Sequence, residues 1–214
     1  MEGNKQGLSY KIKWISNIIK HGLFWHGVRN NMAKIGIDFM PYYYVQEAIT
    51  PLNEPKLRDD KLQFEILEFG EKEIVEIKNT IIGIEQKDLI HDLKNGEVCI
   101  GLKHEDNIAA YMFIKRKPFY FRKKYIKLDS HEAYLHSMYT FENYRGKGVA
   151  PFLRYHSYQL MKSKGVTKFY SVSEYFNKST IKFKKKLNSK HVALFLSIFW
   201  FKKWYMNFTL KRMV

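Results

Sequence analysis

A basic, glycine-containing loop at residues 144–151 holds the residues best suited to bind an anion. Its two glycines let the main chain turn at little steric cost, and Arg145 and Lys147 add two positive charges. Pro151 suits the first position of a helix, and a helix start offers unpaired N–H groups and a positive dipole end. The loop is therefore predicted to bind a pyrophosphate.

The pattern of apolar residues predicts the elements on both sides of this loop. Residues 132–140 read as a strand, and apolar residues recur at helical spacing from Phe152 to Met161. A β-type run at 166–172 precedes a second helical pattern at 177–189. The glycine-loop motifs GxxxxGK[ST] and GxGxxG do not occur in the sequence. The predicted unit is a strand, a phosphate loop and a helix.

This loop resembles the acyl-CoA signature of the GNAT superfamily of N-acetyltransferases. The sequence Arg145-x-x-Gly148-x-Ala150 matches the family pattern Gln/Arg-x-x-Gly-x-Gly/Ala. Five later residues keep the spacing of the family's closing helix: Asn177, Thr180, Phe183, Lys186 and Leu187. The resemblance implies an α/β (α+β) fold, in which a mixed, mostly antiparallel central sheet is flanked by helices.

Two positions depart from the family pattern. Lys184 stands where many members carry the Tyr thought to protonate the departing CoA thiolate. Asn188-Ser189 replaces Gly-Phe, which is a mild change because Asn tolerates the left-handed conformation. Lys184 is therefore predicted to act electrostatically on the thiolate or to belong to a solvated basic helix surface, and Tyr175 is an alternative acid.

By resemblance, the cofactor is acetyl-CoA and no metal is needed. Its pantetheine amides would pair with residues 138–140 like an added strand, and its pyrophosphate would meet the backbone N–H groups of the loop. The predicted cofactor-binding residues are Met138, Tyr139, Thr140, Arg145, Gly146, Lys147, Gly148, Val149, Ala150 and Asn177.

The implied reaction is direct attack of a primary amine on the thioester. A backbone N–H near Tyr139 would polarise the carbonyl oxygen, and the candidates for the general base are Glu132, His136 and Glu174. Strict alternation along residues 132–140 would place His136 on one face of the strand and Tyr139 on the other. A structural role for His136 stays open, because a lone strand histidine is often a satisfied core residue.

Composition limits the classes of partner and site. The chain has 37 Lys and Arg against 21 Asp and Glu, a formal net charge of +16, which favours anionic partners. The single cysteine, Cys99, lies in an apolar run and is read as a buried core residue. The eight histidines form no HExxH motif and no paired-Cys motif accompanies them, so no metal is predicted.

The chain is predicted to divide into an extension at residues 1–60 and a GNAT-like domain at 61–214. Basic and apolar residues alternate at helical spacing from Tyr10 to Ile35, which fits an extra helix on the core or a helix on a membrane surface. Residues 39–49 read as an edge strand and 50–55 as a linker. Within the domain, the predicted strands are 62–69, 98–102, 108–114 and 192–201, and the predicted helices are 73–78 and 87–94.

The acceptor is the least determined part. Residues 118–125 are aromatic and basic, which suits a nucleotide-linked or lipid-linked amino sugar of surface-polysaccharide synthesis, although a plain edge hairpin fits equally. The alternative functions are a basic nucleic-acid-binding or membrane-binding module and a catalytically silent CoA-binding domain. The start of the chain lacks a signal-peptide pattern, which predicts a cytoplasmic protein; contact with the inner face of the membrane and a homodimer are also compatible.

Overall fold

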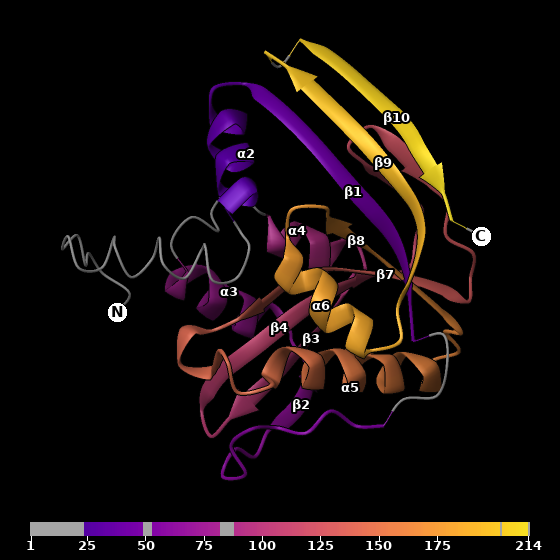
Figure 1. Ribbon diagram of the computed structural model, residues 1–214. Helices are drawn as coiled ribbons and strands as arrows, with labels where there is room; N and C mark the ends of the chain where they lie inside the picture. The colour runs from indigo at the N-terminus through magenta and orange to yellow at the C-terminus, as the bar shows by residue number, and fades with distance from the viewer. Residues whose placement is uncertain (1–23, 49–52, 82–87, 202, 214) are drawn as a thin grey trace, which may run out of the picture. The chain divides into compact units, whose positions relative to one another are not determined.

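The computed structural model describes residues 24–48, 53–81, 88–201 and 203–213 (Figure 1). These residues form two compact units. The first contains the described residues of the ranges 50–119 and 126–169, and the second contains those of 24–49, 120–125 and 170–213. The predicted boundary at residue 60 stays a prediction.

The first unit holds four antiparallel strands in the order β2-β3-β4-β7. The strands are β2 (Glu65–Glu68), β3 (Val98–His104), β4 (Asn107–Lys115) and β7 (Glu132–Thr140). The helices are α3 (Glu71–Thr80), α4 (Leu89–Lys94), the 3₁₀ turn η1 (Glu142–Tyr144) and α5 (Val149–Ser163). The strands and helices predicted for the described part of this unit are confirmed. The strand predicted at 62–69 is shorter than expected and consists of the four residues of β2.

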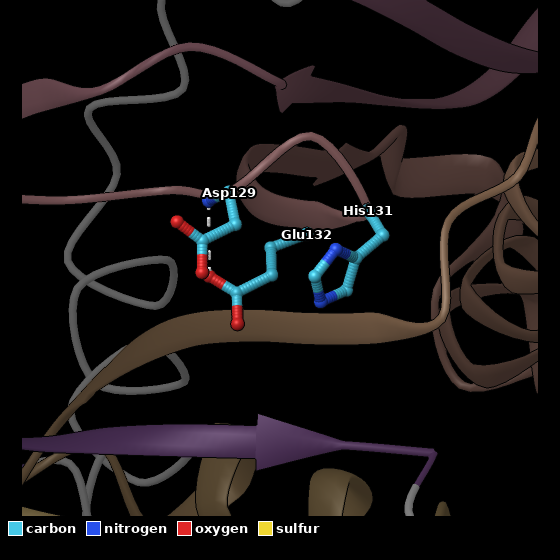
Figure 2. Close-up of side chains that lie close together, drawn as sticks. All are labelled: Asp129, His131 and Glu132. Carbon is cyan, nitrogen blue, oxygen red and sulfur yellow. Dashed lines mark hydrogen bonds between the residues drawn. The ribbon is translucent and has the colours of Figure 1, made fainter.

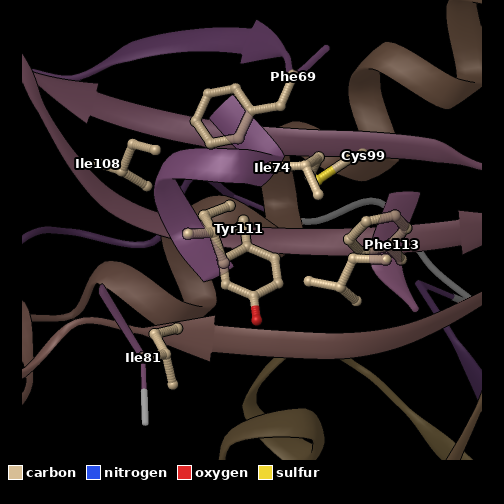
Figure 3. Packing of buried hydrophobic residues seen from close by; sticks show 9 residues of the cluster. Phe69, Ile74, Ile81, Cys99, Ile108, Tyr111 and Phe113 are labelled. Atoms are coloured by element: carbon tan, nitrogen blue, oxygen red, sulfur yellow. The ribbon is translucent and has the colours of Figure 1, made fainter. Parts of the chain in front are cut away.

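Helices cover both faces of this sheet, which explains why β4 is an almost uninterrupted apolar run. Tyr111 and Phe113 lie in a buried cluster with residues of α3 and α4 (Figure 3). Met112, which points to the opposite face, is contacted by Arg154 of α5. A strand that is covered on both faces buries every side chain, so it loses the alternation typical of half-exposed strands.

Cys99 belongs to the same cluster and is 1% exposed. Burial raises the pKa of its thiol, which therefore stays protonated and unreactive. The prediction of a buried core cysteine is confirmed. Neighbouring Gly101 leaves room for the Phe69 ring, because a Cβ at this position would lie 1.9 Å from a ring carbon.

The second unit holds the strand order β10-β9-β1-β8. Its elements are α2 (Phe24–Lys34), β1 (Ile37–Glu47), β8 (Lys168–Glu174, whose first two residues belong to the first unit), α6 (Lys178–Lys186), β9 (Lys190–Trp200) and β10 (Trp204–Arg212). β1 confirms the extended segment predicted at 39–49. The expectation of an edge position is wrong, because β1 pairs along its length with β9 and has β8 on its other side.

β10 was not predicted as a separate strand, and β9 alternates between buried and half-buried side chains where a buried strand was predicted. The segment 118–125 lies in the hairpin of β5 (Phe119–Phe121) and β6 (Lys124–Ile126), so the predicted hairpin is confirmed and its part in binding an acceptor stays a prediction. Arg122 and Lys123 have φ values of 47° and 55°, as a two-residue hairpin turn requires.

Several predictions fall outside the described residues. They are the extension before residue 24, the first half of the linker predicted at 50–55, and residue 87, where the second predicted helix begins. The remainder of the predicted extension helix is confirmed as α2. Among the residues that the structure describes, none of the helices combines the length and the apolar character needed to cross a membrane.

A partly buried ion-pair network ties α2 to the sheet of the second unit. The Asp38 carboxylate accepts hydrogen bonds from Arg29 Nε at 2.7 Å and from Arg122 Nη2 at 2.5 Å. Arg29 also donates to Glu174 at 2.9 Å. Burial opposes the charged form of Asp38, but the hydrogen bonds from the two arginines hold the pKa of Asp38 below its ordinary value.

Asp38→Asn is expected to destabilise the protein by about 3 kcal/mol at neutral pH, because it leaves two arginines without their shared carboxylate. A carboxylate with a lowered pKa stabilises the fold above its unfolded pKa, about 3.9, and loses this effect as the pH falls through the folded value. The difference between variant and wild type in urea unfolding should therefore shrink below about pH 4. Asp129→Asn, at an exposed position, is the matched control; equal losses in both variants would contradict the prediction.

Candidate active site

The centre of β7 contains a β-bulge. Tyr111 of β4 lies opposite Tyr139, but Phe113 lies opposite His136, so two residues of β7 face a single residue of β4 between these pairs. Ser137, one of these two residues, has a φ of 47°, in the left-handed region that non-glycine residues rarely adopt. A bulge interrupts the ladder locally, which is where backbone N–H groups can turn toward a ligand.

The bulge overturns the predicted facing of the strand's side chains. Strict alternation would separate His136 from Tyr139, but the extra residue brings both to the same face of the sheet. The Tyr139 ring stacks 6.1 Å from the Tyr111 ring, and the His136 ring lies 6.0 Å from the Phe113 ring. Two candidate site residues therefore share the face that also carries the cluster under α3 and α4.

His136 lies at the middle of a hydrogen-bonded chain. Its Nε2 is 2.7 Å from Glu97 Oε2, and its Nδ1 is 3.0 Å from the Ser137 hydroxyl oxygen. Lys115 pairs with the other carboxylate oxygen of Glu97. The Glu97 side chain is 9% exposed and that of His136 is 17% exposed, so the chain is largely shielded from water.

Electrostatics determine the tautomer of His136. Burial raises the pKa of Glu97, but hydrogen bonds from His136 and Lys115 outweigh it and lower the pKa below its ordinary value. An ionised carboxylate only accepts hydrogen bonds, so Nε2 must carry the proton of the neutral imidazole. The basic lone pair is then on Nδ1, facing the Ser137 hydroxyl. Sequence reasoning selected His136 but missed Glu97, which lies 39 residues away in the chain.

The predicted phosphate loop leads directly into α5. Gly148 caps this helix in the left-handed conformation, with a φ of 85°, and Gly146 has a φ of 77°. The sequence predicted Pro151 as the first residue of this helix. The helix starts at Val149, so Pro151 is its third residue. The first N–H groups of a helix have no intrahelical acceptor, and their binding of a pyrophosphate stays a prediction.

The end of the predicted extension, just after the predicted linker at 50–55, packs against this loop. The Arg58 backbone N–H donates to the Lys147 carbonyl at 2.9 Å, and its guanidinium reaches the Gly146 carbonyl at 3.2 Å. Asp59 pairs with Lys147 at 3.5 Å. The segment thereby holds the loop from outside the strand–loop–helix unit, and it adds a cation. Local pattern gave no signal for this contact, because it joins residues about ninety positions apart.

Arg145 connects the loop to the end of β7. Its Nε donates to the Thr140 carbonyl at 2.9 Å, and its Nη2 donates to the Tyr139 hydroxyl at 2.8 Å. The guanidinium also lies 5.2 Å from the centre of the Tyr139 ring. These contacts give Arg145 a structural role, and its contact with a phosphate stays a prediction. Of the other predicted cofactor-binding residues, Met138 lies in β7, and Val149 and Ala150 are the first two residues of α5.

Glu132 lies at the opposite end of β7. It is four residues before His136, about 13 Å along a strand, so the structure does not bring these two base candidates together. With Asp129 and His131 it forms a group whose ligand atoms lie within 4.8 Å of one another (Figure 2). Glu132 accepts a hydrogen bond from the Asp129 N–H at 3.2 Å and has the Lys168 ammonium 3.7 Å away, which opposes a bound cation. The absence of a metal stays a prediction.

In the second unit, Lys184 is buried. Its ammonium donates to Ser171 Oγ at 2.6 Å and to the Val172 carbonyl at 2.9 Å, and it lies 3.4 Å from the buried Glu47 carboxylate. The alternative of a solvated surface lysine is wrong, because its aliphatic stem and charge are both enclosed. Its predicted action on a thiolate is not favoured, since the ammonium is already committed to protein oxygens.

The other candidates of the second unit also have structural partners. The Asn177 side chain caps α6 by accepting from the Thr180 N–H at 3.1 Å. Glu174 accepts from Arg29, which makes it a poor base. Tyr175 lies 5.6 Å from the Tyr43 ring. The contact of Asn177 with CoA stays a prediction.

Comparison with known proteins identifies the family. The model of the GNAT acetyltransferase family matches residues 61–188, and the chain therefore belongs to this family. The matched range contains the bulged strand, the glycine loop and the closing helix, which carried the resemblance in the sequence.

Solved structures share the fold at low identity. A GNAT acetyltransferase from Colwellia psychrerythraea aligns with a TM-score of 0.54 and 14% identity, over 78% of this chain and 59% of that one. A GNAT-family protein from Novosphingobium aromaticivorans aligns with a TM-score of 0.51 and 17% identity, over 76% of this chain and 65% of that one. The glucosamine N-acetyltransferase region of a fungal multi-domain β-N-acetylglucosaminidase aligns with a TM-score of 0.53 and 14% identity, over 86% of this chain and 23% of that one. The chain thus spans at most about two thirds of these structures. No curated protein matches the chain.

Gly148→Ala is expected to weaken acetyl-CoA binding at least about tenfold more than Gly146→Ala. Both positions have positive φ, so both substitutions cost about 1 kcal/mol of backbone strain. Only at Gly148 would the new Cβ meet a backbone atom, the Lys56 carbonyl oxygen at 3.0 Å, whereas Gly146 faces open space. Isothermal titration with acetyl-CoA makes the comparison, and equal affinities in the two variants would contradict it.

Proposed function

We propose that the protein transfers an acetyl group from acetyl-CoA to a primary amine. The observation that carries this proposal is the bulge at Ser137, which lies on the same strand that leads into the glycine loop and α5. A single strand thus presents a break in its ladder, a histidine beside the break and an anion-binding loop at its end. Membership of the GNAT acetyltransferase family supports the same reaction.

In the proposed complex, the loop 145–150 holds the pyrophosphate through backbone N–H groups, with Arg145 and Lys147 adding charge. The pantetheine arm follows residues 138–140. A backbone N–H beside the bulge polarises the thioester carbonyl as negative charge develops on its oxygen. The amine nitrogen then bonds to the carbonyl carbon, and the carbon–sulfur bond breaks. The nitrogen loses its remaining extra proton to the departing thiolate, so CoA leaves as the thiol.

His136 is the proposed general base. An amine that arrives as ammonium must lose one proton before it attacks. The Nδ1 lone pair receives this proton directly or through the Ser137 hydroxyl, which lies 3.0 Å away. Glu97 then stabilises the imidazolium from the other side of the ring. Glu97 acts through the histidine, so it is a positioning residue.

The proposed acceptor is an amino sugar, linked to a nucleotide or a lipid and used in the synthesis of surface polysaccharide. The support is chemical: sugars bind to aromatic faces, and the segment 118–125 is rich in aromatic and basic residues. The basic composition of the chain favours an acceptor that carries phosphate.

A cytoplasmic protein in peripheral contact with an anionic membrane is also proposed, on a separate observation. The turn after α2 and the turn between β9 and β10 lie together, because a Cβ at Gly36 would be 3.3 Å from Phe201. This turn pair exposes large apolar side chains: Ile35 at 68%, Phe201 at 55% and Trp204 at 70%. Aromatic side chains at an exposed tip of a basic protein suit the interface of an anionic bilayer.

Purified protein should release free thiol from acetyl-CoA when amino sugars are added, and the product should gain one acetyl group by mass spectrometry. His136→Gln should lower kcat by about a hundredfold or more, because it removes the base. Glu97→Gln should retain part of this activity but shift the pH profile of kcat, since a neutral amide no longer stabilises the imidazolium. Lys103→Gln, on the same sheet but outside this chain of hydrogen bonds, is the control.

Acetyl-CoA binding without thiol release for any amine would contradict the enzymatic proposal and favour a silent CoA-binding domain. A pH profile that is unchanged in Glu97→Gln would remove His136 from the role of base.

The turn pair should bind vesicles that contain phosphatidylserine and bind pure phosphatidylcholine vesicles more weakly. Replacing Phe201 and Trp204 together by Ala should lower the partition coefficient between vesicles and water by about tenfold or more. Each ring that enters the bilayer interface contributes up to about 2 kcal/mol. Tyr120→Ala, another exposed aromatic position, should leave vesicle binding unchanged in co-sedimentation. Loss of self-association in place of vesicle binding would assign the turn pair to a homodimer interface.

A further inference from the structure

A polar hollow of about 320 Å³ opens beside the His136–Glu97 pair in the first unit. It lies between the turn that joins α4 to β3 and the connection from β4 to β5. Glu97 forms part of its wall, so the hollow adjoins the proposed general base. Its volume falls in the range of small-molecule sites.

Three consecutive cations line the hollow: Lys115, Arg116 and Lys117. Lys115 is neutralised by Glu97. Arg116 donates to the Ser130 carbonyl at 3.0 Å, and Lys117 donates to the Asn95 carbonyl at 3.3 Å.

Within the described part of the chain, neither Arg116 nor Lys117 has a carboxylate partner, so two positive charges remain at the hollow. A concave site with uncompensated cations and several donors favours an anionic ligand.

An aromatic face leads from the hollow toward the base. The Phe119 ring, which lines the hollow, lies 4.4 Å from the Tyr134 ring, and Tyr134 stacks 5.9 Å from the His136 ring. The Lys115 ammonium lies 5.7 Å from the Phe119 ring centre. Tyr134 is buried, so a sugar in the hollow would pack on the Phe119 ring, where its C–H groups contact the aromatic surface while its hydroxyls stay in reach of polar groups.

We propose that this hollow is the acceptor site and that the acceptor is an amino sugar bearing a phosphate. The sugar ring would lie against Phe119, its phosphate would contact Arg116 and Lys117, and its amine would point toward the Glu97–His136 pair. This inference rests on the proposed acetyl transfer and names the substrate class of that reaction. It assigns the hollow to the acceptor and leaves the loop 145–150 to the CoA pyrophosphate.

The phosphate can come from two classes of compound, a sugar monophosphate and a nucleoside diphosphate sugar. Both present phosphate oxygens next to a pyranose ring, and they differ in the bulk beyond the phosphate. Glucosamine 1-phosphate and UDP-glucosamine represent these sources, and unphosphorylated glucosamine is the reference compound.

The first test is isothermal titration of each compound into the protein without acetyl-CoA. Binding of at least one phosphorylated compound should be about tenfold or more tighter than binding of glucosamine. Arg116→Glu and Lys117→Glu should each abolish this preference. Lys162→Glu, which makes the same charge change on the exposed surface of α5, is the matched control and should keep it.

The second test is steady-state acetyl transfer with the same compounds and variants. Arg116→Glu and Lys117→Glu should raise KM for the phosphorylated acceptor while leaving KM for acetyl-CoA unchanged. A phosphate preference in titration without turnover of any amine would uphold the hollow as a sugar phosphate site and remove the acetyltransferase function. Turnover that is indifferent to both charge reversals, equal binding of phosphorylated and unphosphorylated sugar, or no binding of any of the three compounds would overturn this inference.

Discussion

The geometry of the candidate site depends on one local irregularity, the extra residue that β7 inserts opposite β4. A regular strand commits each backbone N–H to a neighbour and sends successive side chains to opposite faces. The bulge at Ser137 relaxes both constraints at one point. It brings His136 and Tyr139 to a common face and interrupts the ladder just before the residues that lead to the glycine loop. The strain of a left-handed serine is held by the pairing of β7 with β4, whose side chains are almost all buried.

The surroundings of the bulge supply what the strand alone lacks. Glu97, the residue just before β3, fixes the orientation of His136, and Lys115 from β4 keeps that carboxylate ionised. The glycine loop is similarly completed from a distance, because Arg58 binds its carbonyl oxygens. Both arrangements use residues that lie far from the motif in sequence, so the motif by itself is an incomplete description of the site.

The large positive charge of the chain is used in different ways in different places. Lys184 is enclosed with Glu47, and the two arginines around Asp38 are paired, so these cations stabilise the second unit and are not available to a ligand. Arg116 and Lys117, in contrast, contact only neutral carbonyl oxygens among the groups that the structure describes. Net charge indicates an anionic partner. Only the burial and pairing of each cation show whether it stabilises the fold or is available to bind an anion.

The sequence by itself determined the order of the elements, the strand–loop–helix unit and the family signature, because each depends on residues close together in the chain. Periodicity placed β7 and β4, and the glycine loop placed the start of α5 to within two residues. Tertiary structure decided the bulge, the pairing of His136 with Glu97, the burial of Lys184 and the interior position of β1. A one-residue register shift and a contact between distant residues leave no local pattern, since both arise from the way strands pair and helices pack around them.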